Sequence, residues 1–289
     1  MPDFAACQAR KPDLQRLRTV QSKTQNTSRK PAGQLATEVF NPQSAFRNRM
    51  NYFAHAYAHL AEETLDAYFL AGLATPDWLT VVARRMKCRT RHVEPWLAHD
   101  DPRWAALARG IARHHADDRW FHETRPFTEL SLRFSKLIQQ HCSDRSNMRP
   151  SFLGHILVEL LLDAELIARD PRRLDRYYAA IHRADAERVA AWIEQMSGNS
   201  VGELAAFIPR FVSVRFLADY AGDDSLCYRV NQVLCRVGLT ELPASFSAIL
   251  PTLRQHVAQN AQALMAASTP QAISSQLSAF SQNSQIPSG

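Results

Sequence analysis

Residues 110–122 have the sequence Gly-Ile-Ala-Arg-His-His-Ala-Asp-Asp-Arg-Trp-Phe-His. This stretch places His114, Asp118 and His122 at positions i, i+4 and i+8, which form one continuous face of an α-helix. Imidazole and carboxylate groups one turn apart can point at a single divalent metal ion without bending the backbone. We therefore expect a helix here that contributes to a metal site built between helices.

A second segment repeats this spacing with His155, Glu159 and Asp163 in an otherwise apolar stretch. Because that helix is apolar nearly all round, its three polar side chains are expected to be buried. A buried carboxylate is costly unless it is paired, so Glu159 and Asp163 need a cationic partner. Arg149 is one candidate, and a metal ion shared with the first stretch is the other.

The same residues also have a simpler interpretation. Asp117, Asp118 and Arg119 are equally consistent with an ordinary solvated face of a helix. The buried carboxylates of the second segment favour the metal over that alternative. A third pair, His55 and His59, has the same spacing of four residues.

The net positive charge of the chain lies entirely in its first 49 residues. Residues 1–49 contain nine Lys or Arg and three acidic residues, which accounts for the whole net charge of +6. The remaining 240 residues are balanced, so the basic pI of about 9.2 does not indicate nucleic-acid binding. No apolar run approaches the roughly 20 residues of a membrane span. The odd number of cysteines, five, with no metal or disulfide spacing, favours a reducing compartment, and a cytoplasmic protein is expected.

Three parts are expected along the chain. Residues 1–49 are polar, basic and aperiodic, which predicts a disordered leader, and Met50 is a plausible true start. Residues 50–267 form one all-α domain, because helical periodicity and cap residues recur without an alternating strand pattern. Residues 268–289 are Ser, Gln, Asn and Pro in a polar mixture and are expected to be a disordered tail.

Cap residues and periodicity predict the helices of the central part. The expected spans are 51–70, 75–87, 102–122, 127–141, 150–168, 171–196, 201–220, 224–237 and 246–266. In this interpretation Gly72 breaks the first helix, Thr75 caps the second, and Ser200 with Glu203 forms a capping box. Asp77 is then either an acid that complements the helix dipole or a metal ligand.

A dense basic run lies between positions 84 and 92. Its cations are Arg84, Arg85, Lys87, Arg89 and Arg91. Such a run is usually a solvated face, but in a neutral domain it is also the obvious place for an acidic partner to bind.

These motifs, taken together, resemble the acyl carrier protein phosphodiesterase family, divergent relatives of the HD-domain phosphohydrolases. The similar segments are 50–55 (Met-Asn-Tyr-Phe-Ala-His), 71–77 (Ala-Gly-Leu-Ala-Thr-Pro-Asp), 110–122, the helix with Glu159 and Asp163, 216–220 (Phe-Leu-Ala-Asp-Tyr) and the helix containing Asn231. They occur in the family's order and cover roughly residues 50–265. The resemblance implies an all-α domain with the HD-type architecture.

The resemblance also implies an activity, which is hydrolysis of the phosphodiester that joins 4′-phosphopantetheine to a serine of acyl carrier protein. Such enzymes depend on a divalent metal, with Mn²⁺ preferred over Mg²⁺, Fe²⁺ or Zn²⁺. Carried over by position, the implied ligands are His55, Asp77, His114, Asp118 and Asp163. An acidic carrier protein would then bind the basic run.

Three positions depart from the family pattern. His122 and Glu159 replace aspartates, and His115 stands where the family usually has arginine. Each of these side chains can bind a metal or carry a proton, so we assign His115, His122 and Glu159 to catalysis, with His115 as general acid or phosphate-orienting residue.

Two other function classes remain open. One is a different metallohydrolase, such as a zinc-dependent phospholipase C-like enzyme or a nucleotide phosphohydrolase. The other is a helical binding protein that has lost turnover, which would bind no metal tightly and would tolerate replacement of Asp118.

Overall fold

The computed structural model describes residues 51–84, 86–142 and 148–266, and they fold as one all-α domain with no strand among them. The helices are α1 Tyr52–Tyr57, η3 His59–Ala61, α2 Ala67–Val82, α3 Thr90–Val93, η4 Glu94–Trp96, α4 Pro102–Glu123, α5 Arg125–His141, α6 Pro150–Arg169, α7 Pro171–His182, α8 Ala186–Ser197, α9 Leu204–Val214, η5 Phe216–Ala221, α10 Asp223–Arg236, η6 Ala244–Ile249 and α11 Leu250–Met265. The predicted fold class is confirmed. The expected leader and tail lie outside the described residues.

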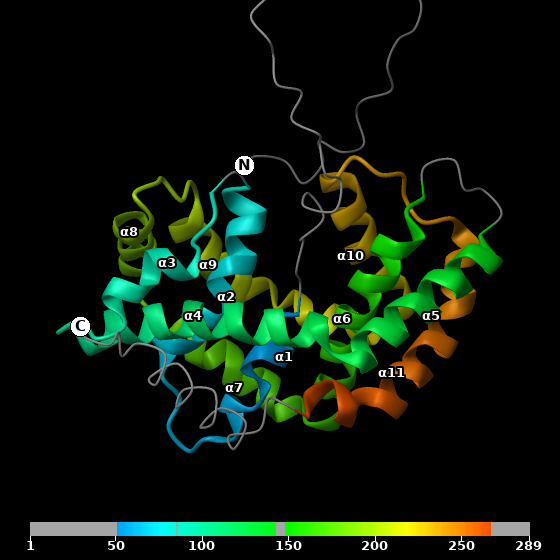
Figure 1. Ribbon diagram of the computed structural model, residues 1–289, viewed down its shortest axis with the longest axis horizontal. Coiled ribbons are helices and arrows are strands. Elements are labelled where there is room, and N and C mark those ends of the chain that lie inside the picture. The colour runs from blue at the N-terminus through cyan, green and yellow to red at the C-terminus, as the bar shows by residue number, and fades with distance from the viewer. Residues whose placement is uncertain (1–50, 85, 143–147, 267–289) are drawn as a thin grey trace, which may run out of the picture. The chain divides into compact units, whose positions relative to one another are not determined.

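Helices α2 and α4 cross so closely that only glycine fits at the contact. A Cβ atom on Gly110 would lie 2.2 Å from the carbonyl oxygen of Phe69, and one on Gly72 would lie 2.3 Å from that of Leu107. Gly72 is therefore an interior residue of α2 that allows the crossing, and the prediction that it breaks a helix is wrong. Figure 1 shows α2 lying against α4.

The start of α2 also differs from the prediction. Asp66 caps the helix by accepting hydrogen bonds from the amides of Tyr68 and Phe69. The predicted cap, Thr75, is buried inside α2 and donates its hydroxyl to the carbonyl of Ala71, 2.8 Å away. The predicted helix 51–70 is likewise wrong, because α1 ends at Tyr57 and a short 3₁₀ turn follows.

The segment that joins α1 to α2 is held by two arginines of α7 and by Arg183, which directly follows that helix. Arg173, Arg176 and Arg183 donate to backbone carbonyls of residues 57, 60, 62 and 65. These bonds satisfy carbonyl groups that no regular helix could satisfy in this segment. They fix the end of α1, the helix that carries His55.

The predictions for α4 and α6 are confirmed. Asp101 caps α4 by accepting from the amide of Arg103, and Pro102 occupies its first turn. α6 is buried along most of its length and packs against α5 and α11. Its Gly154 lies against the backbone of α5, because a Cβ atom there would be 2.6 Å from the Ser131 carbonyl oxygen.

Several later boundaries were predicted wrongly. The expected helix 171–196 is two helices, because Asp185 accepts from the amide of Arg188 and starts α8 there. The capping box of Ser200 and Glu203 is absent from α9, which begins at Leu204 without a side-chain cap. The expected continuation of that helix to Tyr220 is a separate 3₁₀ helix, η5. No helix among the described residues is long and apolar enough to cross a membrane.

Candidate functional site

A row of buried polar side chains runs along α4 and α6. On α4, His114 and Asp118 are at most 1% exposed and His122 is half-buried. On α6, Glu159 and Asp163 are both fully buried. The expected burial of Glu159 and Asp163 is confirmed, whereas His155, which was expected to be buried with them, is only half-buried, with 32% of its side chain exposed.

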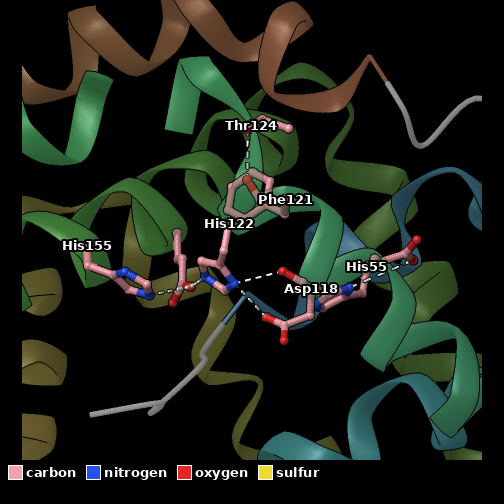
Figure 2. A network of polar contacts seen from close by, with 8 residues as sticks. His55, Asp118, Phe121, His122, Thr124 and His155 are labelled. Carbon is pink, nitrogen blue, oxygen red and sulfur yellow. Dashed lines mark hydrogen bonds and ion pairs between the residues drawn. The ribbon is translucent and has the colours of Figure 1, made fainter. Parts of the chain in front are cut away.

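Three of these side chains converge on one point between α4 and α6. Nε2 of His122 lies 2.9 Å from Oε1 of Glu159, and Nε2 of His155 lies 3.2 Å from the same oxygen. The two imidazole rings stack with their centroids 4.7 Å apart. Figure 2 shows His155 and His122 close together, with dashed lines from His122 toward Asp118. One ligand atom from each residue lies within 4.8 Å of the others, a separation that suits a metal ion.

Asp118 contacts the second ring nitrogen of His122, the one that faces away from Glu159. Nδ1 of His122 lies 2.7 Å from the backbone carbonyl oxygen of Asp118 and 3.1 Å from its carboxylate Oδ1. Both acceptors favour a proton on Nδ1, so Nε2 would be available to a metal ion bound beside Glu159. Histidines that bind metals are commonly oriented by such a carboxylate or carbonyl contact.

Glu159 is ionised in this environment although it is fully buried. Burial opposes its negative charge, but His155 and His122 outweigh burial and lower its pKa to about 2. A carboxylate buried in this way needs a cation beside it, either an imidazolium or a bound metal ion. Two imidazoles and one carboxylate are a donor set suited to Zn²⁺, Fe²⁺ or Mn²⁺, so the residues present fit a divalent metal.

Aromatic rings close one side of this cluster. The ring of Phe127 meets His122 and His155 edge to face, at centroid distances of 4.7 and 4.9 Å. Phe121 packs on Phe127 at 4.7 Å. These contacts restrict both imidazole planes and exclude water from that side, which strengthens electrostatic interactions inside the cluster.

A second pair of histidines lies further toward the start of α4. The rings of His55 and His114 are 4.2 Å apart, and Nδ1 of His114 donates to the carbonyl oxygen of Leu73, 2.8 Å away. Nδ1 of His55 faces the carboxylate of Asp117 at 3.9 Å, and Asp117 forms a 2.6 Å ion pair with Arg113. Burial opposes ionisation of Asp117, but His55 and Arg113 lower its pKa below the ordinary value.

Asp163 anchors the start of α1. Its carboxylate accepts hydrogen bonds from the backbone amides of Phe53 and Ala54, at 3.1 and 2.8 Å. Burial raises its pKa well above the ordinary value, and the two amides oppose that rise. A cationic partner was predicted for both Glu159 and Asp163, and the observed partners are two histidines for Glu159 and two helix amides for Asp163.

Three other predicted residues lie around this row. Asp77 is buried inside α2, three turns from its start, so it is not a helix-start acid. Nε2 of His115 lies 2.6 Å from the carbonyl oxygen of Cys88, which connects α4 to the basic segment. His59 lies in η3 and faces Glu62 at 3.4 Å, so it does not continue the face of His55.

The basic residues of the predicted docking run lie between the end of α2 and the end of α3. Arg84, Lys87, Arg89 and Arg91 are exposed, and Arg84 donates to the carbonyl oxygen of Arg236. Arg85 lies outside the described residues.

Sequence reasoning underestimated two residues. His155 was recognised only by its spacing, yet it completes the three-residue cluster with His122 and Glu159. Asp117 was considered only as part of a possible solvated face and was assigned to no site, although its spacing of four from Arg113 was a signal for the ion pair between them. Comparison of the chain with protein-family models, with curated proteins and with solved structures found no match.

Proposed function

We propose that this protein is a divalent-metal-dependent hydrolase of phosphoric esters, with the metal held by His122, His155 and Glu159. The observation that supports this most directly is the convergence of two imidazole nitrogens and a buried carboxylate oxygen on one point. A structural ion pair would need only one histidine, whereas two on a single carboxylate oxygen form a donor set for a metal.

The chain's own residues contribute orientation and charge. Asp118 fixes the ring of His122, and Phe127 packs against both imidazoles, so the ligands are preorganised before a metal binds. His155 is the most exposed of the three, with 32% of its side chain accessible, so substrate would approach from its side. A bound divalent metal would supply charge neutralisation on phosphate oxygens and a water of lowered pKa.

The proposed substrate is the phosphodiester between 4′-phosphopantetheine and a serine of acyl carrier protein. Its support is the succession of motifs over roughly residues 50–265 that resembles the acyl carrier protein phosphodiesterase family. In that family pattern His55, Asp77, His114, Asp118 and Asp163 would be ligands. We assign Asp118 to orientation of His122, because its carboxylate contacts that ring, and Asp163 to the anchoring of α1, because it binds two amides.

The test is release of phosphopantetheine from a holo carrier protein in the presence of Mn²⁺. Wild-type protein should release it, and His155→Gln should lose most of the activity because one ligand is removed. His141→Gln is the matched control, since His141 is an exposed histidine of α5 that bonds only to the carbonyl oxygen of Leu137 among the contacts described. Equal activity of all three proteins would refute the assignment of the metal ligands.

The basic segment is the proposed docking surface for the acidic carrier protein. The double variant Arg89→Glu, Arg91→Glu should raise KM with little change in kcat, because long-range attraction governs encounter rather than chemistry. Arg172→Glu is the control, since Arg172 is 92% exposed and lies on α7. An unchanged KM for the double variant at low salt would exclude this surface.

A second candidate is a zinc-dependent hydrolase of another phosphoric ester. Two histidines and one glutamate are a recognised ligand set of catalytic zinc, which is the observation that favours it. Stoichiometric zinc together with hydrolysis of lipid or nucleotide esters, and no release of phosphopantetheine, would identify this candidate.

A further inference from the structure

Two arginines meet between the end of α2 and the end of α10. Arg84 lies two residues beyond α2, and its Nη1 donates to the backbone carbonyl oxygen of Arg236, the last residue of α10, at 3.1 Å. Nε of Arg236 donates to the carbonyl oxygen of Gln232, one turn earlier in α10, at 3.2 Å. Each guanidinium has five N–H donors, so most of the donors of this pair can bind a ligand.

Neither guanidinium of this pair forms an ion pair with a carboxylate in the part of the chain that the structure describes. Other arginines at this end of the molecule do so, because Arg229 bonds to Asp219 and Arg254 bonds to Asp223, each at 2.8 Å. Asp223 begins α10 and Arg236 ends it, so the two lie about 20 Å apart along the helix. Two positive charges therefore lie together without the acid that the neighbouring arginines have.

The surroundings of Arg236 make its charge costly. Its side chain is half-buried, and burial lowers the pKa of its guanidinium. Two buried tyrosines, Tyr52 and Tyr220, oppose this effect, whereas the cation of Arg84 adds to it. The dipole of α10 favours a cation at this end of the helix, but that interaction is weak beside the repulsion of a second cation in contact with the same turn. A bound anion would remove this repulsion.

We propose that Arg84 and Arg236 form a binding site for a phosphate dianion, either inorganic phosphate or a phosphomonoester. Two guanidinium groups match the oxygens of a tetrahedral phosphate, and its two negative charges match theirs. A carboxylate or a phosphodiester carries one charge and would leave one cation uncompensated. The site shares no residue with His122, His155 and Glu159, so it does not depend on the proposed function. The contact with α10 assigns Arg84 to this site rather than to the docking run.

The test is isothermal titration calorimetry of the full-length protein at pH 8 with EDTA present, so that no phosphate binds through a metal ion. Inorganic phosphate and methyl phosphate are mainly dianions at this pH, since the second pKa of a phosphomonoester is about 6. Dimethyl phosphate and acetate are monoanions of matched small size. The first variant is Arg84→Gln, because Arg84 is exposed, and the second is Arg236→Gln. Arg172→Gln is the control, because Arg172 is 92% exposed on α7.

We expect the dianions to bind about tenfold more tightly than the monoanions, and each variant of the pair to weaken dianion binding about tenfold, because a charged hydrogen bond is lost. Arg172→Gln should bind as the wild type does. Tighter binding of methyl phosphate than of inorganic phosphate, or the reverse, would support the site and identify the source of its ligand. No binding of either dianion, equally tight binding of the monoanions, or unchanged affinity in Arg84→Gln would overturn the proposal.

Discussion

Replacement of Gly110 by alanine tests the helix crossing on which the polar row depends. The new Cβ atom would lie 2.2 Å from the Phe69 carbonyl oxygen and 2.9 Å from the Cα of Gly72. Both neighbours belong to the backbone of α2, so neither can rotate away. The two helices would have to move apart, and Leu73, whose carbonyl accepts from His114, would move with α2.

The expected cost follows from two opposing effects. Overpacking at a rigid contact costs about 3 kcal/mol, whereas alanine is a better helix former than glycine by about 1 kcal/mol. The net loss in the free energy of unfolding is therefore about 2 kcal/mol. For a domain of this size such a loss lowers Tm by about 4–8 °C.

Urea denaturation followed by circular dichroism measures this change directly. Gly198→Ala is the control, because Gly198 has φ +66° and no atom within 4 Å of the added Cβ. This control should lower the free energy of unfolding by about 1 kcal/mol, because alanine is strained in the left-handed backbone conformation. If Gly110→Ala instead stabilises the protein by about 1 kcal/mol, the change reflects only the higher helix propensity of alanine. The added Cβ atom then meets no clash, and the close crossing of α2 and α4 is wrong.

Three further predictions concern the cluster and the start of α4. Asp118→Asn should weaken Mn²⁺ affinity about 10–100-fold without unfolding the protein, because it weakens the contact that orients His122; unchanged affinity in a calorimetric titration would contradict that role. Phe127→Ala should destabilise the protein by about 3–5 kcal/mol in urea denaturation, since a fully packed ring is lost. Hydrogen bonds and charge from Arg103 lower the pKa of Asp101 to about 2 from 3.8, so its stabilisation is full above 3.8 and is lost as the pH falls toward 2. Asp101→Ala should therefore lower Tm clearly at pH 6 and less at pH 3, and an equal effect at both would exclude a charge-dependent cap.

The helices that bear the polar row could be predicted because local signals agreed there. Asp101 and Pro102 start α4, and Pro150 starts α6, as expected from cap chemistry and periodicity. Gly72 and Thr75 gave the wrong boundary for α2, because in isolation they are typical of helix ends. Their actual roles, a close helix contact and an internal hydroxyl bond, depend on α4 and on burial.

The spacing of the site residues was predictable, but their partners were not. Positions i, i+4 and i+8 determine which side chains share a face, whereas the rotation of α4 against α6 determines which faces meet. That rotation depends on tertiary packing, as the close contact of Gly154 of α6 with the backbone of α5 depends on it. The spacing in the sequence therefore indicated that His155 belongs to the site. It did not indicate that His155 and His122 contact the same oxygen of Glu159.

The most direct test of the central claim is the metal content of the purified protein by elemental analysis, with Glu159→Gln measured in parallel. Glutamine preserves the size of the side chain and removes the charge that binds the cation. We predict nearly one manganese, iron or zinc ion per wild-type chain and almost none in the variant. No metal in the wild-type protein after supplementation, or equal metal in both proteins, would contradict a metal centre at His122, His155 and Glu159.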